Sequence, residues 1–257
     1  MCVPGPICLR ANPLRANREA LARALEAEGV LTRPATFARD GLVVTSARPN
    51  LLALDTHRLG WFEVQDEASQ LVAAIVAAKP GETVLDFCAG AGGKTLALAA
   101  AMRGEGRLAA WDPDPERLRR LEARARRAGA RVEINRDLEA DAVLVDAPCS
   151  ELGTLRRGPD LRFRLREEDT LRFPGLQRNI LEGASRRVKA GGRLVYATCT
   201  IRSEENEEVA LAFERAHPEL QRVDVAAPPD LVRNGFMRTW PHRHEMDGFF
   251  AAAWRRV

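Results

Sequence analysis

The chain has 257 residues, of which 46% are hydrophobic and 29% charged. This composition excludes disordered and fibrous proteins and predicts one large domain, or a domain with a small appendage. Its apolar runs are interrupted by charge well short of the roughly 20 residues that cross a bilayer, and residues 1–6 lack the regions of an export signal, so we expect a cytoplasmic protein. The 39 basic residues nearly balance 36 acidic ones, and the net charge of +3 only weakly favours a nucleic-acid partner.

The chain changes character at residues 59–66, and the part before this point indicates a small α+β module. Residues 17–28 have the amphipathic spacing of an arginine-bearing helix, and residues 41–45 have the apolar pattern of a short strand. We therefore assign residues 1–58 to a small α+β module and residues 59–257 to a second, larger domain.

Helices and strands alternate through the larger domain. The predicted elements are helix 66–78, strand 83–87, helix 93–102, strand 107–111, helix 114–128, strand 131–134, strand 142–145, helix 176–188, strand 193–197, helix 204–216 and strand 249–254. Such alternation is typical of a parallel sheet with helices on both faces. The sequence thus predicts a doubly wound α/β domain.

A loop of small residues follows the first predicted strand of this domain, where doubly wound sheets bind their ligands. This glycine loop, residues 86–95, has the sequence Asp-Phe-Cys-Ala-Gly-Ala-Gly-Gly-Lys-Thr, which lets the backbone approach a ligand closely. A P-loop is disfavoured because Cys88 stands where its first glycine is required. A dinucleotide fingerprint is only partly matched because Thr95 replaces its third glycine. The third alternative, an adenosyl ligand without a pyrophosphate group, demands less of the loop.

Two aspartates follow the next two predicted strands. Asp112 comes roughly 20 residues after the glycines, where a carboxylate can accept hydrogen bonds from both ribose hydroxyls. Aspartate is also a common helix cap, but Asp114 is the better placed of the two for capping. Asp137 is a candidate for contact with an adenine amino group, although a lone aspartate in a loop is more often a turn residue.

Two cysteines stand just beyond the following two strands, in D-A-P-C-S at residues 146–150 and T-C-T at residues 198–200. Either cysteine alone is more often a small buried apolar residue. Together, beside Asp146 and near a loop for an adenosyl ligand, Cys149 and Cys199 favour a nucleophilic role. The five cysteines form no C-x-x-C pair, so we expect no zinc site, no other metal and no disulfide framework.

With these motifs the sequence resembles the Sun/NOP family of RsmB-like, S-adenosylmethionine-dependent RNA cytosine-5 methyltransferases over most of its length. Residues 86–95 are similar to the family's D-x-C-A-A-P-G-G-K-T, residues 146–150 match its D-A-P-C-S, and residues 198–200 are similar to its T-C-[ST]. Further matches are R-x-N at 10–12, Q-D-x-A-S at 65–69, Gly153, the pairs 156–157, 159–160 and 205–206, and D-G-F-F at 247–250.

The resemblance implies a Rossmann-like methyltransferase domain with S-adenosyl-L-methionine as its cofactor. The residues that it assigns to the methyl donor are Cys88, Ala89, Gly90, Ala91, Gly92, Gly93, Lys94, Asp112, Asp137 and Asp146. It assigns Cys199 as the nucleophile that adds to C6 of cytosine, which makes C5 nucleophilic, and Cys149 as the residue that helps release the product. Asp146, the third implied catalytic residue, would hydrogen-bond the ring at N3 and its amino group.

The resemblance implies RNA as the partner and favours ribosomal RNA over transfer RNA. We expect no membrane partner and a monomeric protein. The residues expected to place the RNA are the module 1–58 and Arg156, Arg157, Arg162, Arg164 and Arg166, for which a solvated charged face is the alternative. The family's Ala-Pro is Gly90-Ala91 here, which removes a φ-fixing residue and is expected to soften the glycine loop. The competing interpretation is a non-catalytic nucleotide- or RNA-binding module whose cysteines are core residues.

Overall fold

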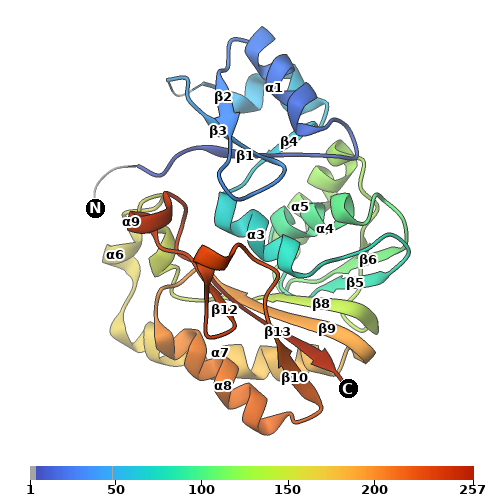
Figure 1. Ribbon diagram of the computed structural model, residues 1–257, viewed down its shortest axis with the longest axis vertical. Coiled ribbons are helices and arrows are strands. Elements are labelled where there is room, and N and C mark those ends of the chain that lie inside the picture. Colours follow the sequence, from blue (N-terminus) through green and yellow to red (C-terminus); the bar gives the residue numbers. More distant parts are fainter. Residues whose placement is uncertain (1–3, 48) are drawn as a thin grey trace.

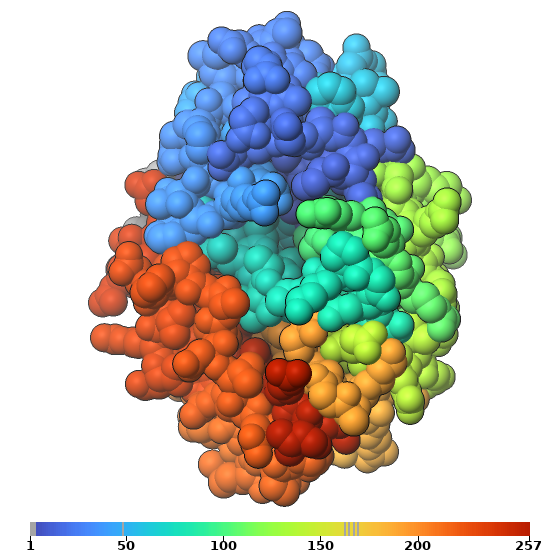
Figure 2. Space-filling model, turned by 45° about the vertical axis from the view of Figure 1, so that its right-hand side comes forward, coloured from blue at the N-terminus to red at the C-terminus, as the bar shows by residue number. Residues whose placement is uncertain are grey.

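The computed structural model describes residues 4–47 and 49–257, apart from the side chains of residues 162, 164, 167 and 169. It consists of a small N-terminal unit set against a larger α/β unit (Figure 1). Figure 2 shows the N-terminal unit, in blue, lying directly against teal and green segments of the larger unit. Within the described ranges, no helix combines the length and the apolar character that a membrane crossing requires.

A four-stranded antiparallel sheet builds the N-terminal unit, in the order β2-β3-β1-β4. Its elements are β1 (Cys8–Ala11), α1 (Arg18–Ala27), β2 (Thr32–Pro34), β3 (Gly41–Val44), α2 (Asp55–Arg58) and β4 (Phe62–Val64). Helix α1 begins after Asn17, whose side chain accepts a hydrogen bond from the Ala20 N–H. Its apolar face buries Leu21 and Leu25 in the core of this unit. Strand β4 lies after the predicted boundary between residues 58 and 59, yet it pairs with β1.

The larger unit is built on a nine-stranded sheet in the order β11-β12-β13-β9-β8-β5-β6-β7, with β10 beside β13. The parallel strands are β5 (Thr83–Asp86), β6 (Arg107–Ala110), β7 (Glu133–Ile134), β8 (Ala140–Asp146) and β9 (Val188–Thr198). The antiparallel strands are β10 (Leu220–Val223), β11 (Val232–Arg233), β12 (Phe236–Arg238) and β13 (Phe250–Arg256). The helices are α3 (Glu67–Ile75), α4 (Gly93–Ala101), α5 (Pro115–Ala128), α6 (Leu161–Arg164), α7 (Glu167–Ser185), α8 (Glu207–Ala216) and α9 (Pro241–His244).

Each face of this sheet has its own apolar core, because successive side chains of a strand point to opposite faces. Ala142 and Leu144 of β8 pack in a cluster with α3 and α4, whereas Val143 and Val145 pack in a cluster with α7 and α8. Figure 1 shows these helix pairs on opposite sides of the sheet. The predicted doubly wound α/β fold is therefore confirmed.

Some element boundaries differ from the predicted ones. Helix α7 begins at Glu167 and continues through Pro174, whereas the sequence predicts a helix only after this proline, which normally disrupts a helix interior. The strands β10, β11 and β12 were not predicted. They have 4, 2 and 3 residues, too few for a hydrophobic period to stand out.

Two of the arginines expected to contact RNA are part of a buried ion-pair cluster within the chain. Arg156 Nε donates to Asp247 Oδ1 at 2.8 Å, Arg157 Nη2 donates to Asp66 Oδ2 at 2.6 Å, and Arg157 Nε also donates to Asp247. The side chains of Asp66 and Asp247 are only 7% and 3% exposed, and buried carboxylates require such compensation. Arg156 and Arg157 thus have a structural role within the chain, and their contact with RNA stays a prediction.

For the other three arginines expected to place the RNA, contact with RNA stays a prediction. The side chains of Arg162 and Arg164 lie outside the described part of the chain. Arg166 has an interaction within the chain, and its contact with RNA stays a prediction.

Removing the Arg157 guanidinium leaves two buried acidic side chains with one arginine between them. We expect Arg157→Ala to lower the free energy of unfolding by roughly 2 kcal/mol, less than for a fully buried pair because Arg157 is partly exposed. Urea denaturation followed by circular dichroism measures this. Arg119→Ala, which removes an exposed arginine paired with Glu116, is the matched control and should change stability by less than about 0.5 kcal/mol. Equal stability of Arg157→Ala and wild type, with a flatter salt dependence of RNA binding, would contradict the structural role and support the RNA contact.

Candidate active site

The glycine loop turns sharply from β5 into α4. Gly92 precedes the helix with a φ of +88°, and a Cβ there would lie 2.7 Å from Leu121 Cγ, so glycine is required on both conformational and steric grounds. The Gly90 N–H donates to Asp112 Oδ2 at 2.9 Å. The loop is thus bound to the segment that follows β6.

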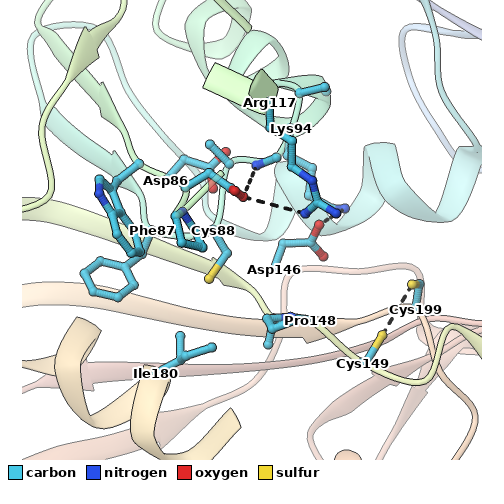
Figure 3. Close-up of a pocket in the computed structure, with 18 of the residues that line it drawn as sticks. Asp86, Phe87, Cys88, Lys94, Arg117, Asp146, Pro148, Cys149, Ile180 and Cys199 are labelled. Carbon is cyan, nitrogen blue, oxygen red and sulfur yellow. Dashed lines mark hydrogen bonds and ion pairs between the residues drawn. The ribbon is translucent and has the colours of Figure 1, made fainter. Parts of the chain in front are cut away.

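A cavity of about 680 Å³ opens between this loop and the ends of the neighbouring strands (Figure 3). Ten of the predicted site residues line this cavity: Cys88, Ala89, Gly90, Ala91, Gly93, Lys94, Asp112, Asp146, Cys149 and Cys199. Residues for which the sequence predicted no role also line it, among them Asp86, Trp111, Arg117 and Arg136. Two predicted residues, Gly92 and Asp137, are not among the residues that line the cavity.

Asp112 is buried at the cavity wall and organises two backbone segments. Its Oδ2 accepts from Gly90 N and its Oδ1 accepts from Asp114 N at 2.9 Å. Asp114 caps α5 by accepting from Glu116 N at 2.8 Å. The structure therefore assigns the capping role to Asp114. Asp112 remains at the cavity, where Arg117 Nη1 lies 3.9 Å from its Oδ2, and its oxygens keep lone pairs for further donors.

Asp137 does not turn toward the cavity. Its side chain is 73% exposed and pairs with Arg187, so the expected contact with an adenine amino group has no support in the structure. The preceding residue, Arg136, lines the cavity instead, with its guanidinium 4.6 Å from the Trp111 ring centroid and 5.6 Å from that of Phe87. Cation–π contacts of this length fix a guanidinium over an aromatic surface.

Asp86, at the end of β5, carries a polar atom that nothing in the described chain satisfies. Its Oδ2 accepts from Thr95 Oγ1 at 2.7 Å, while its buried Oδ1 has no hydrogen-bond partner among the described residues. Burial, reinforced by the nearby Asp146, raises the pKa of Asp86 to about 7. A buried carboxylate oxygen of this kind can accept a hydrogen bond from a ligand or from a water molecule. The sequence signal was present, because Asp86 opens the glycine-loop motif.

The two predicted cysteines meet at the ends of adjacent parallel strands. Asp146 of β8 is in register with Ala197 of β9, so the loops that follow the two strands run side by side. Cys149 and Cys199 have their sulfur atoms 3.4 Å apart (Figure 3). The hydrogen bond with Cys149, together with burial, raises the pKa of Cys199 well above its usual value. The Cys199 side chain is therefore a neutral thiol at rest.

Gly153 allows the loop after Cys149 to approach the second cysteine. Its N–H donates to Cys199 O at 3.0 Å, and its carbonyl accepts from Gly248 N at 2.9 Å. A Cβ at Gly153 would lie 2.0 Å from Gly248 O, so only glycine permits these backbone contacts.

Lys94 joins the glycine loop to the cysteine side of the cavity. Its ammonium donates to Asp146 Oδ2 at 2.6 Å and lies 5.0 Å from the Phe249 ring centroid. Burial alone would lower the pKa of Lys94, but the contact with Asp146 outweighs it and raises this pKa, so the Lys94 ammonium is charged at neutral pH. Figure 3 shows Asp146 between the glycine loop and the two sulfur atoms.

Sequence comparison places these motifs in a known family. The family model described as 16S rRNA methyltransferase RsmB/F matches residues 73–255. The probable ribosomal RNA small subunit methyltransferase B of Bacillus subtilis is 32% identical over 99% of this chain and 60% of that protein. The ribosomal RNA small subunit methyltransferase B of Yersinia pseudotuberculosis is 34% identical over 96% of this chain and 59% of its own length. The chain thus spans about three fifths of these curated relatives.

Solved structures agree with this placement. The crystal structure of PH0851 superposes with a TM-score of 0.93 and 38% identity, over 98% of this chain and 60% of that one. A methyltransferase homolog protein from Pyrococcus horikoshii has a TM-score of 0.85 and 28% identity, over 99% of this chain and 87% of that one. NSun6 from Pyrococcus horikoshii, crystallised with SFG, shares the fold with a TM-score of 0.89 at 22% identity, over 100% and 92%. With its motifs and fold both matched, the chain belongs to the 16S rRNA methyltransferase RsmB/F family.

Proposed function

We propose that the protein methylates C5 of a cytosine in 16S ribosomal RNA, with S-adenosyl-L-methionine as the methyl donor and a covalent adduct between Cys199 and C6. One observation carries this proposal: two thiols 3.4 Å apart share a cavity with the glycine loop and the Lys94–Asp146 ion pair. A nucleophile, a second thiol and a fixed carboxylate are the groups that this reaction needs.

The residues around the cavity suit S-adenosyl-L-methionine, which when bound supplies an electrophilic methyl group. The volume of about 680 Å³ is in the range of small-molecule sites. Asp112 has free lone pairs for ribose hydroxyls, and the unpartnered Oδ1 of Asp86 suits a positively charged amino group. Residues 88–94 would hold the donor with these carboxylates, whereas Asp137 has no part in this proposal because its side chain points elsewhere.

The side chains on the other wall of the cavity would act on the cytosine. Attack by the Cys199 sulfur on C6 turns C5 into an enamine-like carbon that accepts the methyl group. The proton that the Cys199 thiol loses on attack would pass to N3. Asp146, held by Lys94, would then accept hydrogen bonds from the protonated N3 and from the exocyclic amino group. Cys149, or a water molecule that it orients, would remove the C5 proton so that Cys199 can leave.

The choice of 16S ribosomal RNA rests on the family description and on the names of the relatives. The test is incubation of the protein and labelled donor with a 16S transcript and, separately, with unmodified transfer RNA, followed by bisulfite sequencing. We expect 5-methylcytosine at one position of the 16S transcript. Methylation of transfer RNA alone would mean that the substrate is transfer RNA and not 16S ribosomal RNA. Donor binding without methyl transfer to either RNA would indicate a binding module.

The donor site can be tested at Asp112 without RNA. We expect Asp112→Ala to weaken donor binding by roughly 1.5–3 kcal/mol, which is about 10- to 160-fold in Kd, because a charged hydrogen-bond acceptor is lost. Isothermal titration calorimetry measures this. Asp114→Ala is the matched control: it should destabilise α5 by about 1 kcal/mol but leave the donor Kd within about twofold. Unchanged binding by Asp112→Ala, or tight ATP binding in place of the donor, would refute the assignment.

Alanine variants of the two cysteines should block the reaction at different steps. Cys199→Ala should form no covalent adduct and transfer no methyl group, because no sulfur remains to saturate C6. Cys149→Ala should still attack and transfer but stall at proton removal, so a denaturation-resistant protein–RNA complex should accumulate on a denaturing gel.

Cys8→Ala is the control for these variants, since it removes a buried thiol from β1 in the N-terminal unit and should methylate as wild type does. Adduct accumulation by Cys199→Ala and its loss in Cys149→Ala would reverse the roles. Normal methylation by both variants would make them packing residues.

A further inference from the structure

The loops that carry the two thiols are joined by a buried hydrogen-bonded cluster. Ser150 follows Cys149 in the chain and Thr200 follows Cys199. Their hydroxyl oxygens are 2.7 Å apart, and the two residues are 1% and 0% exposed. The residue next to one thiol is thus bonded directly to the residue next to the other.

Glu205, which is fully buried, anchors this cluster. Its Oε1 accepts from Ser150 Oγ at 2.5 Å, and its Oε2 accepts from Ser150 N at 2.9 Å. Because the Ser150 hydroxyl donates its proton to the carboxylate, the Thr200 hydroxyl must donate to Ser150. The hydrogen bonds therefore run in one direction, from Thr200 through Ser150 to Glu205, and chains of this kind strengthen one another.

Gln177 of α7 extends the cluster to the other side of the first thiol. Its Nε2 donates to Glu205 Oε2 and to Pro148 O, both at 3.0 Å. Cys149 is consequently held from both of its chain neighbours, Pro148 and Ser150. Ser150, Thr200 and Glu205 do not belong to the cavity lining, so these groups influence the site through the lining residues that they hold, Cys149 and Cys199 among them.

We propose that Ser150, Thr200 and Glu205 are positioning residues that set the distance between the Cys149 and Cys199 sulfur atoms. In the wild type, this fixed distance keeps Cys149 within reach of C5 while Cys199 is bonded to C6. The catalytic meaning of this inference rests on the proposed function, whereas the geometry it asserts concerns the two thiols alone. The two parts can therefore be tested separately.

The substitutions at Thr200 separate a hydrogen-bonding role from a packing role. Thr200→Val keeps the volume of the side chain but removes its hydroxyl, and Thr200→Ser keeps the hydroxyl but removes a methyl group. Thr56→Val is the matched control, because Thr56 is a buried threonine of the N-terminal unit whose hydroxyl has no partner among the described residues. Glu205→Gln, which removes the charge of the anchor, is the second variant should Thr200→Val fail to fold.

The first readout needs no RNA. Alkylation of Cys199 by iodoacetamide is followed against pH, with the Cys199 peptide quantified by mass spectrometry. The contact with Cys149 raises the pKa of Cys199, so separated sulfur atoms should move the alkylation curve to lower pH, by about half a unit or more. We expect this shift in Thr200→Val and in Glu205→Gln, wild-type behaviour in Thr56→Val, and restoration of the wild-type curve by Thr200→Ser. Curves for Thr200→Val and wild type that superimpose would overturn the proposal.

The second readout links the cluster to the reaction. In a single turnover on the 16S transcript, Thr200→Val should accumulate about tenfold more covalent protein–RNA complex than wild type, because a displaced Cys149 slows release. Thr200→Ser should return the complex to the wild-type level. A larger defect in Thr200→Ser than in Thr200→Val would show a packing role and refute the positioning role. If wild type itself forms no complex with the transcript, the proposed function fails, and the alkylation curves still decide the geometry.

Discussion

Parallel pairing of β5, β8 and β9 is the constraint on which the whole site depends. Strands that run in the same direction end at the same edge of a sheet, so the residues after them share one space. The register pairs Asp86 with Leu144 and Asp146 with Ala197, which places two carboxylates and the loops of both cysteines along that edge. Because side chains alternate between the faces of a strand, a slip of one residue would turn Asp146 away from Lys94.

The N-terminal unit contributes to this edge although it supplies none of the predicted catalytic residues. Arg10 of β1 donates to Gly93 O at 2.7 Å, and Arg124 of α5 donates to Ala91 O at 2.7 Å while it pairs with Glu63 of β4 at 2.8 Å. Burial lowers the pKa of Arg10 to about 10, so this arginine is still charged at neutral pH. These two hydrogen bonds fix the carbonyl groups of Ala91 and Gly93. They oppose the greater flexibility expected of the glycine loop, which lacks the family's proline.

The sequence predicted the parts of the site whose positions follow from the backbone alone. Cys149 and Cys199 come directly after strands with a clear apolar pattern, and the ends of parallel strands converge whatever the side chains do. Asp137 could not be placed in this way, because the direction of a loop side chain depends on its tertiary partner, here Arg187. Arg157 is a similar case. Its partner Asp247 is 90 residues away in the chain, and no local pattern reports such a contact.

The charges around the cavity connect the two halves of the chemistry. Among the described residues, the cavity lining carries four acidic side chains, Asp86, Asp112, Asp146 and Glu151, and four basic ones, Lys94, Arg117, Arg124 and Arg136. The cavity therefore offers partners for groups of either charge. Asp146 also raises the pKa of Cys199, while Lys94 lowers it. A cationic ligand in the same cavity must act on the thiol as Lys94 does, because an added positive charge stabilises the thiolate. Linkage makes the effect reciprocal, so a deprotonated Cys199 also tightens the binding of that ligand. The arrangement therefore favours a protonated Cys199, and a positively charged ligand in the cavity would favour its ionisation.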